Sequence, residues 1–146
     1  PEVTALAREA ALNDPDPDIR KDVIFWLAES DAEGTLDVLA DIYRNDKDEK
    51  VRAAAFWAII NNTEEEKALK LIRQFYQGAK TRDEKRNIAV IFSQFDSDEA
   101  ADILMELLKK ETDKELKRHM LIYLGQMDSE KAQEYLIQAM EKKLEK

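Results

Sequence analysis

The amino-acid sequence predicts an all-α protein: a right-handed α-α superhelix of stacked helical hairpins, about four and a half repeats and nine helices long. Three observations predict this class. The 146 residues include only three Gly and three Pro, the strongest breakers of regular helices. A residue pattern returns every 32 or 33 positions. Each copy also carries apolar residues at helical spacing, so each can present an apolar stripe to its neighbours.

The first helix of each repeat, called the A helix, is expected at residues 19–27, 51–59, 84–92 and 116–124. In the first copy, we expect Ile19, Val23, Trp26 and Leu27 to form the buried arc. The fifth and ninth positions are apolar in every copy, and the second position is basic. These columns are Val23, Ala55, Ile88 and Met120; Leu27, Ile59, Phe92 and Leu124; and Arg20, Arg52, Lys85 and Lys117.

The second helix of each repeat, called the B helix, carries three apolar columns on one stripe. They are Val38, Leu71, Ile103 and Tyr135; Leu39, Ile72, Leu104 and Leu136; and Ile42, Phe75, Leu107 and Ala139. Residues 3–13 fit a lone B helix, with Leu6, Ala7 and Ala10 in the same columns. We therefore predict one repeat domain over residues 1–146, with a half repeat at 1–14 and helical hairpins at 15–46, 47–79, 80–111 and 112–146.

Side chains that can cap helix N-termini occur just before the predicted helices. An N-cap oxygen accepts backbone N–H groups that have no partner inside the helix. Residues 81–84 and 63–66 also match the capping box, in which a glutamate reaches back to the N–H of the capping threonine. Pro17 is expected at the first helical position, where its missing N–H costs nothing. The expected N-caps are Asp16, Asp48, Thr81 and Asp113 for A helices, and Ser97 and Ser129 for the last two B helices.

The residues that begin the first two A helices resemble the HEAT-repeat family, including bacterial HEAT-like repeats related to the phycobilisome-lyase type. The resemblance rests on residues 14–20, which run Asp-Pro-Asp-Pro-Asp-Ile-Arg, and on a weaker echo at 48–55. It implies a HEAT-like solenoid with A helices on the convex side and B helices on the concave side, where partners bind. It also implies a ladder between repeats, formed by the Asp before each A helix and the Arg just inside it. Arg20 and Arg52 match this pattern, whereas Lys85 and Lys117 lack the two-pronged guanidinium group.

One apolar column of the A helix lies almost opposite the expected buried arc, because successive helical residues turn by about 100°. Two interpretations stay open. A helices contact neighbours on both flanks, so a wide buried arc can absorb this column. Alternatively, an exposed apolar column marks a face for a partner or for self-association. The residues of this apolar row are Phe25, Trp57, Val90 and Ile122.

The open face of the B helices carries two polar rows in which acids outnumber bases. Such a face favours a basic peptide or a Lys/Arg-rich protein, and it predicts salt-sensitive binding. The alternative is a solvated helix face with no ligand. These acidic rows are Asp37, Lys70, Asp102 and Glu134, and then Asp41, Gln74, Glu106 and Gln138.

The composition argues against several functional classes. The net charge of −9 disfavours nucleic acid and anionic membranes as partners. The sequence has no Cys and no Gly-rich phosphate loop, and its single histidine, His119, is expected to be an exposed helical residue. The repeated His-Glu pairs of HEAT-type deoxyhypusine hydroxylases are missing, as is the basic groove of HEAT-like DNA glycosylases. We therefore predict no catalytic residue, metal or cofactor, and we expect core packing for Trp26, Trp57, Tyr43 and Tyr76.

The sequence predicts a non-catalytic protein–protein interaction scaffold that binds through the concave B-helix face or through the apolar row. The expected partner is a protein or peptide, basic in character, or a second copy of the chain. Two alternatives stay open: a structural module or engineered repeat protein without an evolved ligand, and, ranked below it, a HEAT-derived enzyme. No apolar stretch approaches the roughly 20 residues that span a bilayer, and no signal-peptide pattern occurs, so we expect a soluble, cytoplasmic protein.

Overall fold

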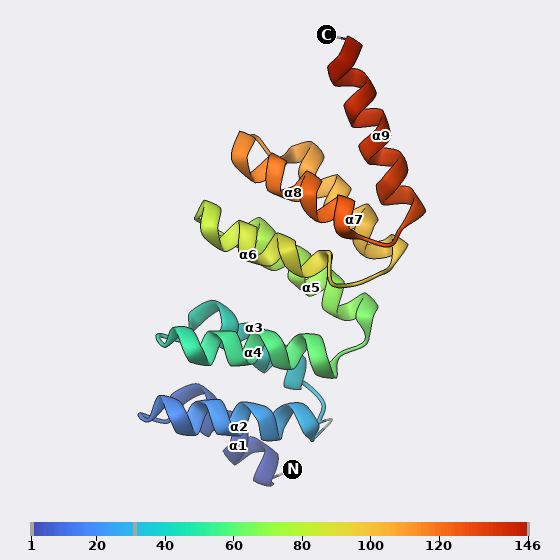
Figure 1. Ribbon diagram of the computed structural model, residues 1–146. Coiled ribbons are helices and arrows are strands. Elements are labelled where there is room, and N and C mark those ends of the chain that lie inside the picture. The colour runs from blue at the N-terminus through green and yellow to red at the C-terminus, as the bar shows by residue number, and fades with distance from the viewer. Residues whose placement is uncertain (1, 31, 146) are drawn as a thin grey trace. The chain divides into compact units, whose positions relative to one another are not determined.

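The computed structural model in Figure 1 describes residues 2–30 and 32–145. Over these residues the chain forms nine helices and no strand, which confirms the predicted all-α class. The A helices carry even numbers and the B helices carry odd numbers. The helices are α1 (Glu2–Asn13), α2 (Pro17–Glu29), α3 (Thr35–Asn45), α4 (Glu49–Asn62), α5 (Glu65–Gly78), α6 (Arg82–Phe92), α7 (Asp98–Lys110), α8 (Lys114–Gln126) and α9 (Glu130–Glu145).

The chain folds as two compact units, which we call the N-unit (Pro1–Leu71) and the C-unit (Ile72–Lys146). In the N-unit, α2 and α4 lie side by side in one layer, and α1 and α3 pack behind them (Figure 1). In the C-unit, α6 packs beside α8 and α7 beside α9, and both α7 and α9 contact α8. Helix α5 crosses the boundary between the units. Within each unit, A helices therefore pack beside A helices and B helices beside B helices.

The centre of each unit is formed by the apolar columns of the sequence. The ninth A-helix position is fully buried in all four copies. Burying a Leu, Ile or Phe side chain contributes about 1.5–3 kcal/mol relative to leaving it exposed, so this column is a main source of stability in both units. Most residues of the B-helix columns are buried as well, and the half-buried ones are Val38, Leu71, Tyr135, Leu136 and Ala139. The ninth-position residues are Leu27, Ile59, Phe92 and Leu124.

The predicted buried arc of α2 is wrong at two positions. Ile19 and Trp26 are 43% and 45% exposed, whereas Ile24 is fully buried. The equivalent residues of α4, Val51 and Ala58, are buried. Helix α4 packs against α2, but α2 is the first A helix of the described chain, and no A helix there covers its other flank. The same column is therefore core in α4 and surface in α2.

The predicted N-caps are confirmed. Each capping side chain accepts a backbone N–H from the first turn of its helix, at 2.7–3.3 Å. Pro17 is the first residue of α2, as predicted. The capping residues are Asp16, Asp48, Thr81, Ser97, Asp113 and Ser129.

The two capping boxes differ from the prediction. Glu84 Oε2 accepts the backbone N–H of Lys80 at 3.3 Å, one residue before the expected donor at Thr81. Thr63 ends α4 instead of capping α5, because α5 starts at Glu65 and the Ala68 N–H bonds to the Glu64 carbonyl oxygen. The Glu64 carbonyl oxygen, and not the Thr63 side chain, therefore accepts a backbone N–H at the start of α5.

Candidate interaction surfaces

A buried acid–base contact joins α2 to the loop before α4 in the N-unit. Arg20 Nε donates to Asp46 Oδ2 at 3.0 Å, and Arg20 Nη2 donates to Asp46 Oδ1 at 3.1 Å. Arg20 Nη1 also donates to the Asp14 carbonyl oxygen at 2.6 Å. The two charged side chains are only 11% and 4% exposed, and the hydrogen bond to Asp46 raises the pKa of Arg20. The ladder implied by the HEAT resemblance is therefore present at Arg20.

The loop that holds Asp46 is tied down by the same carboxylate and by the next arginine. Asp46 Oδ1 accepts the Asp48 N–H at 2.9 Å, two residues further on. Arg52 Nη1 donates to the Asp46 carbonyl oxygen at 2.6 Å. Because Asp48 itself caps α4, this loop fixes the start of α4 relative to α2. The contact stabilises the repeat and leaves no free charge for a ligand.

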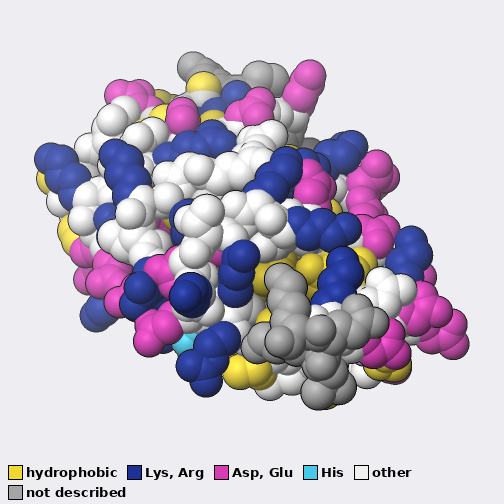
Figure 2. Space-filling model, turned by 90° about the horizontal axis from the view of Figure 1, so that it is seen from above, with side chains coloured by type: hydrophobic (Ala, Val, Ile, Leu, Met, Phe, Trp, Pro, Cys, Tyr) yellow, Lys and Arg dark blue, Asp and Glu magenta, His cyan; other side chains and the backbone are white. Residues whose placement is uncertain are grey.

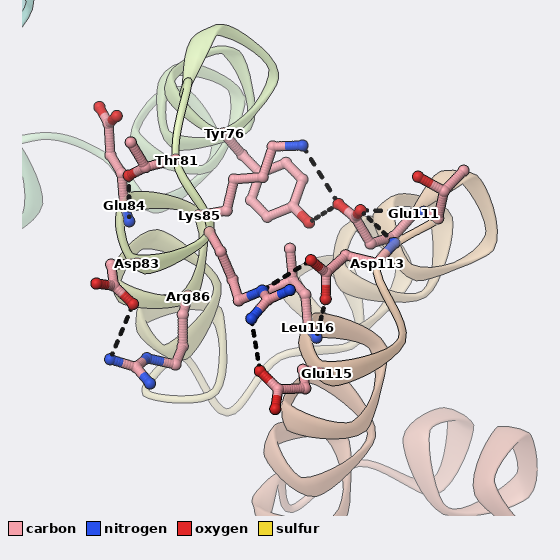
Figure 3. A network of polar contacts seen from close by, with 12 residues as sticks. Tyr76, Thr81, Asp83, Glu84, Lys85, Arg86, Glu111, Asp113, Glu115 and Leu116 are labelled. Atoms are coloured by element: carbon pink, nitrogen blue, oxygen red, sulfur yellow. Dashed lines mark hydrogen bonds and ion pairs between the residues drawn. The ribbon is translucent and has the colours of Figure 1, made fainter.

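The C-unit builds the corresponding contact differently, around Glu111 (Figure 3). Tyr76 Oη donates to Glu111 Oε1 at 2.7 Å, and Lys85 Nζ donates to the same oxygen at 3.4 Å. Glu111 Oε2 accepts the backbone N–H groups of Thr112 and Asp113, each at 3.0 Å. Lys85 Nζ also lies 5.5 Å from the centre of the Tyr76 ring. Both oxygens of this carboxylate, which is 8% exposed, therefore have donors.

The pKa values in this network move in opposite directions. Burial and the hydrogen bond to Glu111 raise the pKa of the Tyr76 hydroxyl. Burial alone would raise the pKa of Glu111, but the Asp113 N–H, the Tyr76 hydroxyl and Lys85 together hold that pKa below its usual range. The network therefore contains an ionised carboxylate and a neutral phenol at neutral pH.

An exposed ion-pair cluster lies beside this network. Arg82 Nε pairs with Asp113 Oδ2 and Arg82 Nη1 with Glu115 Oε2, both at 2.7 Å. The hydrogen bond to Asp113 raises the pKa of Arg82. The Leu116 N–H and then Arg82 lower the pKa of Asp113. Asp113 thus serves as the cap of α8 and as the partner of Arg82.

The apolar row is exposed at three of its four positions. Phe25 is 51% exposed, Trp57 44% and Ile122 54%, whereas Val90 is half-buried. Phe25 and Trp57 occupy equivalent positions on α2 and α4, which pack side by side in the N-unit. The Trp57 ring meets the buried Phe56 ring edge-on, with centroids 6.2 Å apart, so one side of the indole is held while the other meets solvent.

The predictions for the other aromatic residues are mixed. Tyr76 is buried as expected, and Tyr43 is half-buried against Phe56 with ring centroids 5.3 Å apart. The expectation of core packing is wrong for Trp26 and Trp57, which have large exposed fractions. His119, which was expected to be exposed, is half-buried, and its ring stacks on that of Tyr123 with the ring centroids 6.3 Å apart.

The acidic rows are exposed, apart from the half-buried Glu106. In the C-unit, Asp102 pairs with Lys131 at 3.2 Å, and Glu106 pairs with Arg73 and Lys110. The other members there are exposed as well, namely Gln74, Glu134 and Gln138.

In the N-unit, Lys70 pairs with Glu66 at 3.4 Å, whereas Asp37 and Asp41 make no ion pair with any described residue. The carboxylates of the acidic rows that remain uncompensated by a base therefore include Asp37 and Asp41 on α3.

The two units differ strongly in charge. The N-unit contains nine Lys and Arg residues and 17 Asp and Glu residues, a net charge of −8. The C-unit contains 14 basic and 15 acidic residues, a net charge of −1. Figure 2 shows basic and acidic side chains spread together over the face that it presents. Because most of the net charge belongs to the N-unit, the long-range negative field of the chain originates mainly there.

The described residues provide neither a metal-binding cluster nor a membrane-spanning helix. The described side chains contain no cluster of three or more His, Cys, Asp or Glu residues arranged to hold a metal ion. Among the described helices, none combines the length and the apolar character required to cross a bilayer.

Comparison with known proteins identifies the repeat type. A family model described as HEAT repeats matches residues 4–89. The chain belongs to the HEAT-repeat family. HEAT repeats generally mediate protein–protein interaction or scaffolding, and the HEAT fold is typically non-catalytic. No curated protein matches the chain.

Proposed function

We propose that this HEAT-repeat chain is a non-catalytic protein-interaction module that binds its partner through the apolar row, chiefly through Phe25 and Trp57. The observation that carries the proposal is the exposure of two large aromatic rings at equivalent positions of neighbouring helices. Aromatic residues, Trp above all, dominate the energy of protein interfaces when a partner buries them. Burying the remaining exposed area of each ring, roughly 100 Å², contributes about 2–3 kcal/mol.

The acidic rows of the B helices provide a second candidate surface. Asp37 and Asp41 are exposed on α3 without an ion pair, and they lie in the unit that carries most of the net charge. Two uncompensated carboxylates one helical turn apart attract a basic segment at low salt. The apolar row ranks first because uncompensated surface carboxylates also keep proteins soluble without any ligand.

The test compares partner capture by matched variants. Phe25→Ser combined with Trp57→Ser removes both rings from the N-unit, while Ile122→Ser makes the same kind of change at the equivalent C-unit position. We expect proteins captured from a cell extract by the wild-type chain to be lost with the N-unit double variant and retained with Ile122→Ser. Circular dichroism checks that each variant keeps its helices.

Two other outcomes are informative: one contradicts the proposal, and the other identifies the partner as a second copy of the chain. Capture that is unchanged by the N-unit double variant would contradict the proposal. Light scattering over a range of concentrations identifies a second copy of the chain as the partner if the wild type dimerises and the double variant stays monomeric.

A further inference from the structure

Helix α2 carries a compact exposed surface that combines acids with aromatic rings. We call Asp22, Phe25, Trp26 and Glu29 the acid–aromatic patch, and all four residues are exposed. Residues three or four positions apart are neighbours on a helix surface. Asp22 precedes Phe25 by three positions and Trp26 by four, and Glu29 follows them by four and three. Each ring therefore lies between two carboxylates on the same side of α2.

The carboxylates of this patch have no cationic partner. Neither Asp22 nor Glu29 forms an ion pair with a described residue. Arg20, on the same helix, is committed to Asp46 and to the Asp14 carbonyl oxygen. One basic residue of α2, Lys21, lies within one helical turn of Phe25, and it is half-buried. The patch therefore has a surplus of negative charge in a unit whose net charge is already −8.

The combination is specific to α2 and is not a requirement of the repeat. None of the residues equivalent to Asp22 and Glu29 in the other A helices is acidic. In addition, the residues that correspond to Trp26 in α4 and α6 are buried. They are Ala58 and Ile91, with exposed fractions of 3% and 5%. The equivalents of the two acids are Ala54, Asn87 and His119, and then Asn61, Gln94 and Gln126.

We infer that the partner segment that seats on α2 presents Lys or Arg side chains, and that the acid–aromatic patch binds them. A cation is attracted to the face of an aromatic ring, most strongly to Trp, and the flanking carboxylates add direct charge attraction. The aliphatic stem of Lys or Arg packs on Phe25 while its charged end reaches Asp22 or Glu29. The net charge of the N-unit steers such a segment toward it. This inference rests on the proposed function, because Phe25 belongs to both surfaces.

The direct test uses a short unstructured peptide of alternating Arg and Ser, with a second peptide in which neutral citrulline replaces each Arg. Citrulline keeps the shape of Arg and removes its charge. In fluorescence anisotropy titrations, we expect the Arg peptide to bind about tenfold more tightly at low salt. Binding should weaken several-fold between about 20 mM and about 300 mM NaCl, as the Debye length shortens. Equal affinity for both peptides, or no binding of either at low salt, overturns the inference.

Matched charge variants locate the binding. Asp22→Asn combined with Glu29→Gln removes two charges from the patch, and Glu64→Gln combined with Glu65→Gln removes two charges from exposed positions of the N-unit at the start of α5. We expect a loss of about fivefold or more for the first pair and less than about twofold for the second. Equal losses would mean that the Arg peptide responds only to net charge, which overturns the patch. Trp26→Leu, which keeps both carboxylates, should also weaken the Arg peptide more than the citrulline peptide.

The outcomes separate this inference from the proposed function. A captured partner that needs Phe25 and Trp57 but still binds the Asp22→Asn, Glu29→Gln variant leaves the proposed function standing and removes the inference. If the Arg peptide binds the patch but captured proteins still bind the Phe25→Ser, Trp57→Ser variant, the proposed function is removed and the patch remains as a surface that binds cations.

Discussion

The N-unit and the C-unit both bury a carboxylate in the loop that precedes an A helix, but they satisfy it with different chemistry. Asp46 receives two parallel hydrogen bonds from one guanidinium group, that of Arg20. Glu111 faces a lysine, whose ammonium group makes one long contact of 3.4 Å, and Tyr76 supplies the short one. A lysine lacks the planar fork of arginine, so a second donor completes the set. The comparison shows that a buried carboxylate needs enough donors, whichever residues provide them.

The largest expected effect comes from breaking the N-unit contact. Asp46→Asn keeps the size of the side chain but leaves the buried Arg20 without its counter-charge, which costs about 3 kcal/mol of unfolding free energy. Both tryptophans, Trp26 and Trp57, lie in the N-unit, so their fluorescence in urea reports its unfolding selectively. Asp41→Asn, at an exposed acid of α3, should stay within about 0.5 kcal/mol of the wild type. Similar losses for the two variants would contradict a special role for Asp46.

The second effect tests whether Tyr76 is the main donor in the C-unit. Tyr76→Phe removes the hydroxyl and keeps the ring, which leaves one oxygen of a buried carboxylate with only the longer contact to Lys85. We expect a loss of about 1–2 kcal/mol, measured by urea unfolding and by faster hydrogen exchange in α8. Tyr135→Phe, at a half-buried tyrosine of α9, is the control and should change stability by less than about 0.5 kcal/mol. An unchanged exchange rate in α8 would assign the role to Lys85 instead.

The third prediction concerns acid pH. The folded state holds the pKa of Glu111 below its unfolded value, about 4.3 for a free glutamate. The resulting stabilisation is complete above that unfolded value and is lost as the pH falls through the lower folded pKa. The stability difference between the wild type and Glu111→Gln should therefore shrink as urea midpoints are compared from pH 6 to about pH 3. A difference that stays constant over this range would contradict the pKa assignment.

The smallest effect is expected at the exposed cluster beside the network. Arg82 is 52% exposed, and its partners Asp113 and Glu115 are 27% and 63% exposed, so water and salt reach and screen both ion pairs. Arg82→Ala should shift the urea midpoint no more than Arg118→Ala, an exposed arginine of α8 that makes no ion pair with a described residue. A shift as large as that of Tyr76→Phe would show that Arg82 belongs to the stabilising network.

The sequence revealed the features that depend on neighbours along the chain. An N-cap needs a side-chain oxygen and an N–H two or three residues away, so Asp16, Asp48 and Asp113 could be recognised directly. The apolar columns followed from helical periodicity in the same way. Glu111 was missed, although it stands two residues before its cap, as Asp46 does. Tyr76 is 35 residues from Glu111, and no local signal connects them.

The exposed surfaces, too, were predicted from the sequence only in part. The apolar row was predicted because Phe25 and Trp57 lie opposite the buried arc, a property of one helix; that they bind a partner stays a prediction. By itself, the sequence determined the all-α class, the repeat length, the helix starts and the net charge, since these depend on residue types and on spacing within a few turns. Only the tertiary structure decided that Trp26 is surface while its equivalent Ala58 is core, because the exposure of a repeated position depends on which neighbouring helix covers it.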